Sequence, residues 1–197
     1  MCKIIVITGG TCSGKTTLIK KVVGKSPNKI KKSKTCTSRT IREEIENNND
    51  YYFFSDKEFE EKIANNEFIE YYKTNNNIYY GLLKSEIDLK SDYIYLIAMN
   101  ESGLDNLRKY LSDKINLSNL YHIHIYSKAN IRLERILNTR CVNNDEDIYE
   151  YCNRMYSGKE EEETLRKEAD FVLNNNYPYE KEKNEIFLEV FCRSILK

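Results

Sequence analysis

The spacing of apolar residues predicts a chain that alternates between buried strands and helices. Residues 3–8, 93–99 and 120–126 are short runs rich in Ile, Val and Tyr, which is typical of strands buried in a sheet. Helices are predicted at residues 16–25, 103–112, 129–138, 148–167 and 179–196, and a last short strand at 171–173. The acidic run at 160–163 is expected on an exposed helix face. This alternation favours an α/β fold with a parallel sheet covered on both faces.

Between about residues 36 and 90 a different pattern predicts a small α+β lobe inserted into this fold. Strands are expected at 51–54, 68–73 and 78–82, with a helix from about residue 56 to 66. Asp56 is the expected N-cap of that helix, whose Phe59 and Ile63 have the i, i+4 spacing of a buried face. We therefore predict one domain over 1–197, with a core of residues 1–35 and 91–197 and a lobe of residues 36–90.

The turn between the first strand and the first helix carries a phosphate-binding motif. Residues 9–16 fit the P-loop pattern G-x-x-x-x-G-K-[ST], in the strand–turn–helix context that the pattern requires. Backbone N–H groups and the helix N-terminus of such a turn bind phosphate oxygens. Lys15 would reach the β- and γ-phosphates of ATP, and the Thr16 hydroxyl would be the Mg²⁺ ligand. The predicted ATP site comprises Gly9, Gly10, Thr11, Cys12, Ser13, Gly14, Lys15, Thr16 and Thr17.

A second candidate anion site follows in the segment T-C-T-S-R-T-I-R at residues 35–42. It contains Arg39 and Arg42, and forked guanidinium groups suit bidentate recognition of a phosphate. The alternative is a pair of solvated surface arginines. Two phosphate sites in one α/β domain would indicate phosphoryl transfer between two phosphorylated molecules.

Charge and cysteine content narrow the expected partners and location. The chain has 31 basic and 31 acidic residues, yet residues 1–42 contain eleven Lys or Arg and no acidic residue. This asymmetry favours a local anion site over a surface that coats nucleic acid. The longest apolar run, residues 4–7, is far shorter than the ~20 residues of a membrane span. Six cysteines without a C-x-x-C pair fit reduced thiols. We expect a cytoplasmic monomer or small homo-oligomer without nucleic-acid or membrane partners.

Several ordered motifs together resemble the guanylate kinase family. Residues 35–42 resemble the family's S-x-T-T-R-x-P-R segment, and residues 50–55 its D-Y-x-F-V-S segment. Residues 66–71 resemble its N-x-F-I-E stretch, and Tyr80-Gly81 its Y-G turn. With the P-loop, the resemblance covers about residues 3–175. It implies a P-loop NTPase-type three-layer fold, with a nucleotide-monophosphate-binding lobe and a mobile lid at about residues 139–148.

The resemblance also implies an activity and the residues that perform it. The reaction would be direct in-line transfer from ATP·Mg²⁺ to GMP or dGMP. Glu70 would accept hydrogen bonds from the guanine N1–H and 2-amino group. Charge on the transferring group would be offset by Lys15, Arg135, Arg140 and Arg154, and Asn174 would lie beside the donor adenine. The acceptor site would comprise Thr35, Arg39, Arg42, Tyr51, Glu70, Tyr80, Gly81 and Asn100.

Three positions depart from the family's pattern and leave alternatives open. The family's L-D-x-D strand end reads I-A-M-N here, with Ala98 and Asn100 in place of two carboxylates. Leu82 replaces the Thr or Ser that follows Y-G and touches the base. One alternative is a kinase of the same architecture that phosphorylates another small phosphorylated acceptor. The other is a guanylate kinase-like binding module without catalysis, although such modules usually lose the P-loop Lys or glycines that this chain keeps.

Overall fold

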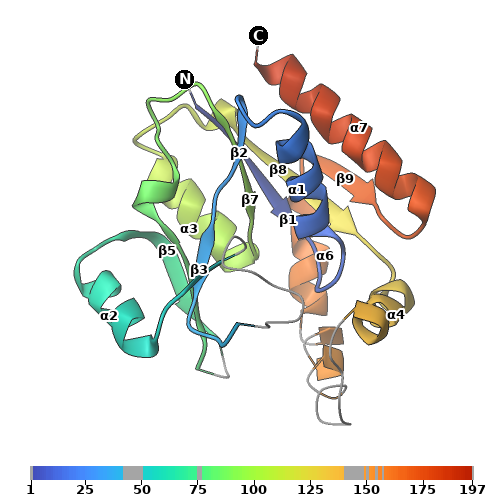
Figure 1. The fold of residues 1–197 in the computed structure, drawn as a ribbon, viewed down its shortest axis with the longest axis horizontal. Helices are drawn as coiled ribbons and strands as arrows, with labels where there is room; N and C mark the ends of the chain where they lie inside the picture. Colours follow the sequence, from blue (N-terminus) through green and yellow to red (C-terminus); the bar gives the residue numbers. More distant parts are fainter. Residues whose placement is uncertain are drawn as a thin grey trace.

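Five parallel strands form the central sheet. The computed structural model describes residues 2–41, 51–74, 77–139, 149, 151–153, 155–156 and 158–196. The strand order is β2-β7-β1-β8-β9, with β1 in the middle (Figure 1). The strands are β1 (Lys3–Thr8), β2 (Ile30–Lys32), β7 (Ile94–Ala98), β8 (Leu120–Tyr126) and β9 (Phe171–Asn174). All four pairings are parallel, which confirms the predicted α/β fold.

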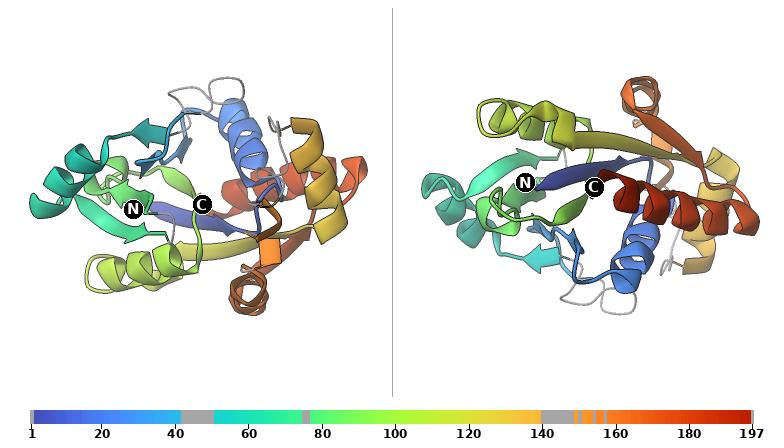
Figure 2. Two further views of the ribbon diagram at one scale, coloured as in Figure 1. Left: turned by 90° about the horizontal axis from the view of Figure 1, so that it is seen from below. Right: turned by 90° about the horizontal axis from the view of Figure 1, so that it is seen from above.

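Helices cover both faces of this sheet (Figure 2). Because strand side chains alternate between faces, Ile5 and Ile7 of β1 pack on one side while Ile4 and Val6 pack on the other. The first side is covered by α1 (Lys15–Lys25) and α7 (Pro178–Ile195). The second side is covered by α3 (Glu101–Leu111) and α6 (Lys159–Glu168). The helix α4 (Ala129–Thr139) follows β8. No helix in the described part of the chain has the length and apolar character needed to cross a membrane.

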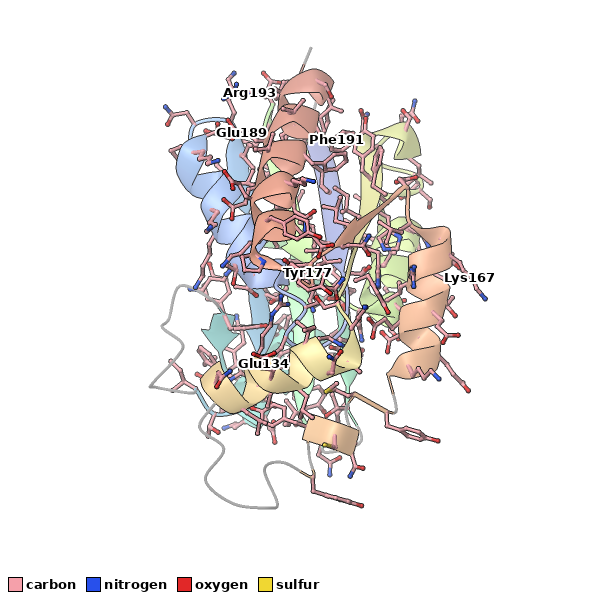
Figure 3. The ribbon with its side chains drawn as sticks, turned by 90° about the vertical axis from the view of Figure 1, so that its right-hand side faces the viewer. Glu134, Lys167, Tyr177, Glu189, Phe191 and Arg193 are labelled. Carbon is pink, nitrogen blue, oxygen red and sulfur yellow. The ribbon has the colours of Figure 1, made fainter. Side chains whose placement is uncertain are left out.

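The C-terminal helix α7 is attached through aromatic packing and ion pairs. The Phe191 ring lies 5.1 Å from the Tyr121 ring and 5.0 Å from the Phe171 ring, between centroids. Figure 3 shows Phe191 on the sheet side of α7 and Arg193 toward the outside. Lys25 Nζ of α1 lies 3.1 Å from a Glu189 carboxylate oxygen. The apolar side of α7 thus packs against α1 and β9 and completes the core on that face of the sheet.

A second sheet of four strands is built from residues 35–83. Its order is β4-β3-β6-β5, and it comprises β3 (Thr35–Thr37), β4 (Tyr51–Phe53), β5 (Phe68–Lys73) and β6 (Tyr79–Leu83). The helix α2 (Asp56–Ala64) packs on it through Phe59, whose ring stacks on Phe68 at 4.5 Å and on Tyr79 at 5.0 Å. These contacts confirm the strands and the helix predicted within residues 51–83.

The predicted N-cap of α2 is wrong by one residue. Ser55 is the N-cap: its hydroxyl accepts from the Glu58 N–H at 3.3 Å, and the Glu58 carboxylate accepts from the Ser55 N–H at 2.7 Å. This reciprocal pair is a capping box, which needs a hydroxyl at the N-cap and a carboxylate three residues later. Asp56 is followed at that distance by Phe59, so it has no such partner.

The single helix predicted over residues 148–167 is also wrong. In the described part, Gly158 is a turn and the N-cap of α6, which begins at Lys159. Glycine disfavours helix interiors by about 1 kcal/mol relative to alanine, which explains an interruption there. The short strand β2 has no counterpart among the predicted elements, because Ile30 is its only strongly apolar residue. Residues 140–148 of the predicted lid lie outside the described residues.

Candidate active site

The two sheets and the helices α4 and α6 surround a cleft of about 1330 Å³. It lies at the carboxyl end of β1, where open α/β sheets bind ligands. From the predicted ATP site, its lining includes Gly9, Gly10, Thr11, Cys12, Gly14, Lys15, Thr16 and Thr17. From the predicted acceptor site, it includes Thr35, Arg39, Tyr51, Glu70, Tyr80, Gly81 and Asn100. Arg135 also lines it, so both predicted sites open into one cavity.

The P-loop follows β1 in a conformation that depends on its glycines. Gly9 and Gly14 have φ angles of 140° and 103°, a region that L side chains rarely adopt. A Cβ on Gly9 would lie 2.4 Å from the Ile125 carbonyl oxygen, which leaves no room for a side chain. Cys12 also adopts a positive φ of 58°. The turn therefore brings the backbone and the N-terminus of α1 to the cleft, where they suit a phosphate group.

Lys15 and Arg135 bind P-loop carbonyl groups from two sides. The Lys15 ammonium donates to the carbonyl oxygens of Gly9, at 2.6 Å, and Gly10, at 3.1 Å. The Arg135 guanidinium, on α4, donates to the Cys12 carbonyl at 3.2 Å and to the Asn175 carbonyl at 2.6 Å. Both cations therefore stay close to the backbone that would surround the donor phosphates.

Glu70 is a buried carboxylate on the acceptor side of the cleft. Its exposed fraction is 5%, and Oε2 has no hydrogen-bond partner among the residues that the structure describes. Burial raises the pKa of Glu70 from 4.5 to about 7. Glu70 lies beside the first turn of α3, where the Asn100 side chain accepts from the Gly103 N–H at 3.0 Å. Because burying an unpartnered carboxylate is costly, this site is suited to a ligand that donates hydrogen bonds.

Aromatic rings and one arginine form the neighbouring wall. The Tyr80 ring stacks on Tyr72 at 5.6 Å, and the Arg39 guanidinium lies 5.1 Å from the centre of the Tyr51 ring. Tyr72 was not among the predicted site residues. It lies two residues after Glu70 on β5, so the period-two alternation of a strand would have indicated it. Burial is the main cause that raises the pKa of Tyr72.

Some predicted site residues do not reach the cleft. Ser13 is fully buried, and Asn174 is exposed at the end of β9, where side chains alternate between faces. The next residue, Asn175, lines the cleft instead and donates to the Ser13 carbonyl at 2.6 Å. Leu82 is fully buried in the core and does not line the cleft. Arg42, Arg140 and Arg154 lie outside the described residues.

Part of the acidic run on α6 faces the cleft, which corrects the expectation of an exposed face. A Glu161 carboxylate oxygen accepts from the Glu101 N–H at 2.9 Å. Glu162 pairs with Arg132 at 3.0 Å, and all three of Glu161, Glu162 and Arg132 line the cleft. Polar composition alone predicts exposure, whereas here tertiary contacts with α3 and α4 bury these groups.

The side chains at the P-loop fit a magnesium ion that arrives with a triphosphate. Within the described residues there is no group of three or more His, Cys, Asp or Glu side chains that would hold a metal ion. Thr16 lines the cleft directly after Lys15. Mg²⁺ is usually bound through one or two protein oxygens together with substrate phosphates and water. A single hydroxyl therefore matches an ion whose other ligands come from the nucleotide.

Comparisons with known proteins agree with this architecture. The family model described as guanylate kinase matches residues 1–182. The guanylate kinase of Mycoplasma mobile is 33% identical over 180 residues, covering 90% of this chain and 87% of that protein. The guanylate kinase of Rickettsia prowazekii is 30% identical over 175 residues, covering 88% and 83%. A crystal structure of guanylate kinase from Anaplasma phagocytophilum matches with a TM-score of 0.63 and 17% identity, covering 98% of this chain and 86% of that chain. The chain belongs to the guanylate kinase family.

Proposed function

We propose that this protein transfers the γ-phosphoryl group of ATP to GMP or dGMP, giving ADP and the nucleoside diphosphate. The observation that carries the proposal is Glu70, a buried carboxylate whose Oε2 has no hydrogen-bond partner in the described residues, in the same cleft as the P-loop. Guanine presents two adjacent donors, N1–H and the 2-amino group, which one carboxylate accepts together. Adenine has an acceptor at N1 and no 2-amino group, so it would leave Glu70 unpaired.

The acceptor phosphate would be held by groups on the second sheet. Arg39, Tyr51 and Tyr80 line the cleft near Glu70 and offer charge-assisted and phenolic hydrogen bonds. We propose the same role for Arg42, and base or sugar contacts for Thr35, Gly81 and Asn100. A bound phosphate needs no further activation, because phosphoryl transfer depends mainly on positioning and on electrostatic stabilisation.

The donor phosphates would be held by the P-loop and by Lys15. When ATP binds, Lys15 would exchange its two carbonyl partners for β- and γ-phosphate oxygens. Thr16 would be the protein ligand of Mg²⁺, which supplies charge neutralisation on those oxygens. We propose that Arg135, Arg140 and Arg154 offset the charge of the transferring group. The lobe at 36–90 and the lid at 139–148 would close to exclude water, since an open site would hydrolyse ATP.

The proposal extends to the setting in which the protein works. Its partners would be the small nucleotides ATP, GMP and dGMP, and the protein would act in the cytoplasm as a monomer or small homo-oligomer. The basic residues that the sequence concentrates before residue 43 include Lys15 and Arg39, which line the cleft. Their position supports a local anion site rather than a surface for nucleic acid.

A coupled assay of ADP release tests the function. Purified protein with ATP·Mg²⁺ would be offered GMP, dGMP, AMP, UMP and CMP in turn. The expected result is ADP release that requires GMP or dGMP and is lost in Lys15→Ala. Lys25→Ala, at the far end of α1, should keep the activity. Release with another acceptor, or no release with any acceptor despite ATP binding, would contradict the proposal.

A further inference from the structure

A buried ion pair connects α4 and α6 at the P-loop. Arg132 Nη2 and Glu162 Oε2 lie 3.0 Å apart, and the exposed fractions of the two side chains are 7% and 13%. Both residues line the cleft, and Figure 1 shows α4 and α6 near the end of the sheet where β1 ends. Neither residue belongs to the predicted site. The pair is therefore a charged part of the cleft wall without an assigned role.

The pair lies directly against the P-loop backbone. A Cβ on Gly10 would lie 1.5 Å from Arg132 Nη1 and 2.8 Å from Glu162 Oε2. The guanidinium thus occupies space that is free only because residue 10 is glycine. Arg135, three residues later on the same face of α4, donates to the Cys12 carbonyl at 3.2 Å. The guanidinium groups of Arg132 and Arg135, both on α4, therefore lie beside the P-loop at Gly10 and Cys12.

The hydrogen bonding of the pair is incomplete. Arg132 Nε and Glu162 Oε1 are buried, and neither has a hydrogen-bond partner in the part of the chain that the structure describes. Buried polar groups in folded proteins are nearly always partnered, and apolar residues of similar size often replace a buried ion pair without loss of stability. The stability of the packed interior alone therefore does not explain why an ion pair is present here. An unpaired N–H beside a phosphate-binding loop suits a ligand rich in acceptor oxygens.

The pKa of His124 is affected by the same concentration of positive charge. Burial is the main cause that lowers the pKa of His124 to about 4, and the charges of Lys15 and Arg132 contribute to the same shift. His124 is two residues before Tyr126 at the end of β8, and its side chain bonds Thr8 Oγ1 at 2.9 Å. Lys15 and Arg132 thus both act on the His124 ring, which bonds Thr8, the residue just before the P-loop.

We propose that Arg132 is a further binding residue for the donor triphosphate, and that Glu162 holds it beside Gly10 in the free protein. The inference rests on the proposed function, because it assumes that the P-loop takes ATP. Glu162 orients the guanidinium and offsets its charge while the cleft is empty. Phosphate oxygens then supply acceptors for the Arg132 guanidinium, whose Nε–H has no partner in the described residues, and this strengthens binding of the triphosphate over binding of an uncharged nucleoside.

Direct binding of a fluorescent ATP analogue to single and double variants tests this role. Arg132→Met alone leaves Glu162 buried without a partner, and its folding is at risk. The double variant R132M/E162M replaces the pair by apolar side chains of similar length. We expect it to unfold close to the wild-type temperature, to lose about tenfold to a hundredfold in ATP affinity, and to bind GMP as the wild type does. Arg108→Met, which removes an exposed partner of Glu168 on α6, is the matched control and should change neither affinity.

A second variant separates binding from support of the fold. Glu162→Gln keeps Arg132 and removes its counter-charge, so we expect ATP to bind at least as tightly as it binds the wild type. Wild-type ATP affinity in R132M/E162M, or a tenfold loss in Glu162→Gln, would overturn the inference. Failure of the proposed function is a different result: the wild type would bind the ATP analogue through Arg132 and yet phosphorylate no GMP.

Discussion

At the scale of single residues, Glu70 is a buried titratable group on the acceptor side of the cleft. Burial without a partner in the described residues raises its pKa to about 7, so the side chain changes charge within the neutral pH range. In the proposed function, the deprotonated form would accept two hydrogen bonds from guanine with the strength of a charged acceptor. Above pH 7 the free protein carries this charge, and below pH 7 it loses the charge progressively.

We expect the KM for GMP to rise as the pH falls from 8 to 6. Glu70→Gln should raise that KM by about tenfold to a hundredfold at pH 8 and remove its dependence on pH in this range. The KM for ATP should be unchanged. Steady-state kinetics at several pH values measure both constants, and Glu182→Gln, an exposed carboxylate of α7, is the control. An equal pH dependence in the wild type and in Glu70→Gln would assign the titration to another group.

The same pKa predicts how stability depends on pH. The folded pKa of about 7 lies above the ordinary value of 4.5 for this carboxyl group, so between these values the folded protein binds more protons than the unfolded chain. The free energy of unfolding therefore falls as the pH rises through this window. Glu70→Gln should be more stable than the wild type at pH 8 by on the order of 3 kcal/mol, and the difference should vanish below about pH 4.5. Denaturant unfolding at pH 8 and pH 4.5 measures it, and a wild type that is the more stable protein at pH 8 would contradict the assignment.

Residues in local motifs could be predicted from the sequence, whereas residues defined by tertiary contacts could not. Lys15 and Gly14 belong to a contiguous pattern whose strand and helix flanks are visible in the sequence. The pairing of Arg132 with Glu162 joins residues 30 positions apart on two helices, and their charge alone indicated exposure. Asn175 lines the cleft in place of Asn174, because strand alternation at the end of β9 decides which of two neighbours points inward.

At the scale of elements, Gly81 in the second sheet and Gly24 in α1 have opposite surroundings: the first is crowded and the second is open. A Cβ on Gly81 of β6 would lie 2.8 Å from the Glu70 carbonyl oxygen and 3.0 Å from a Phe68 ring carbon. A Cβ on Gly24 of α1 would meet no atom within 4 Å in the described residues. The contact at Gly81 therefore fixes how closely β6 approaches the strand that carries Glu70.

We predict changes of opposite sign for the two alanine variants. Gly81→Ala should lower the free energy of unfolding by about 1–3 kcal/mol and raise the KM for GMP, because the strands must separate. Gly24→Ala should raise the free energy of unfolding by up to about 1 kcal/mol, because alanine favours the helix, and should leave both KM values unchanged. Denaturant unfolding and steady-state kinetics measure these effects. Gly81→Ala with wild-type stability and KM would show that β5 and β6 adapt without cost.

Strands rich in apolar residues were predicted well from the sequence, whereas the residue at which the polar helix α6 begins was not. The runs that became β1 and β8 consist mostly of β-branched, aliphatic and aromatic residues, which is why the sequence indicated them as buried strands. The helix α6 is polar at nearly every position, with Leu165 as its buried residue, so its pattern could not reveal that it begins only after Gly158. Ser55 and Glu58 have the S-x-x-E spacing of a capping box, so this local pattern would have indicated Ser55 rather than Asp56 as the N-cap.

At the scale of the whole molecule, the arrangement brings distant residues into one cleft. Lys15 follows β1 in the central sheet, and Glu70 is on β5 in the second sheet, yet both line the same cavity. Hydrophobic pattern predicts strands and helices but not the order β2-β7-β1-β8-β9, which depends on pairings between distant segments. The resemblance in motif order, rather than periodicity, is therefore what implied direct transfer between two nucleotides bound to one domain.

The central claim is that ATP and GMP are bound together in this cleft, so that the phosphoryl group passes directly between them. The most direct test is inhibition by a bisubstrate compound in which adenosine and guanosine are joined through five phosphates. We expect inhibition that is competitive with ATP and also competitive with GMP, and an affinity above that of either nucleotide alone. Competition with ATP only, while GMP binds unhindered, would contradict it.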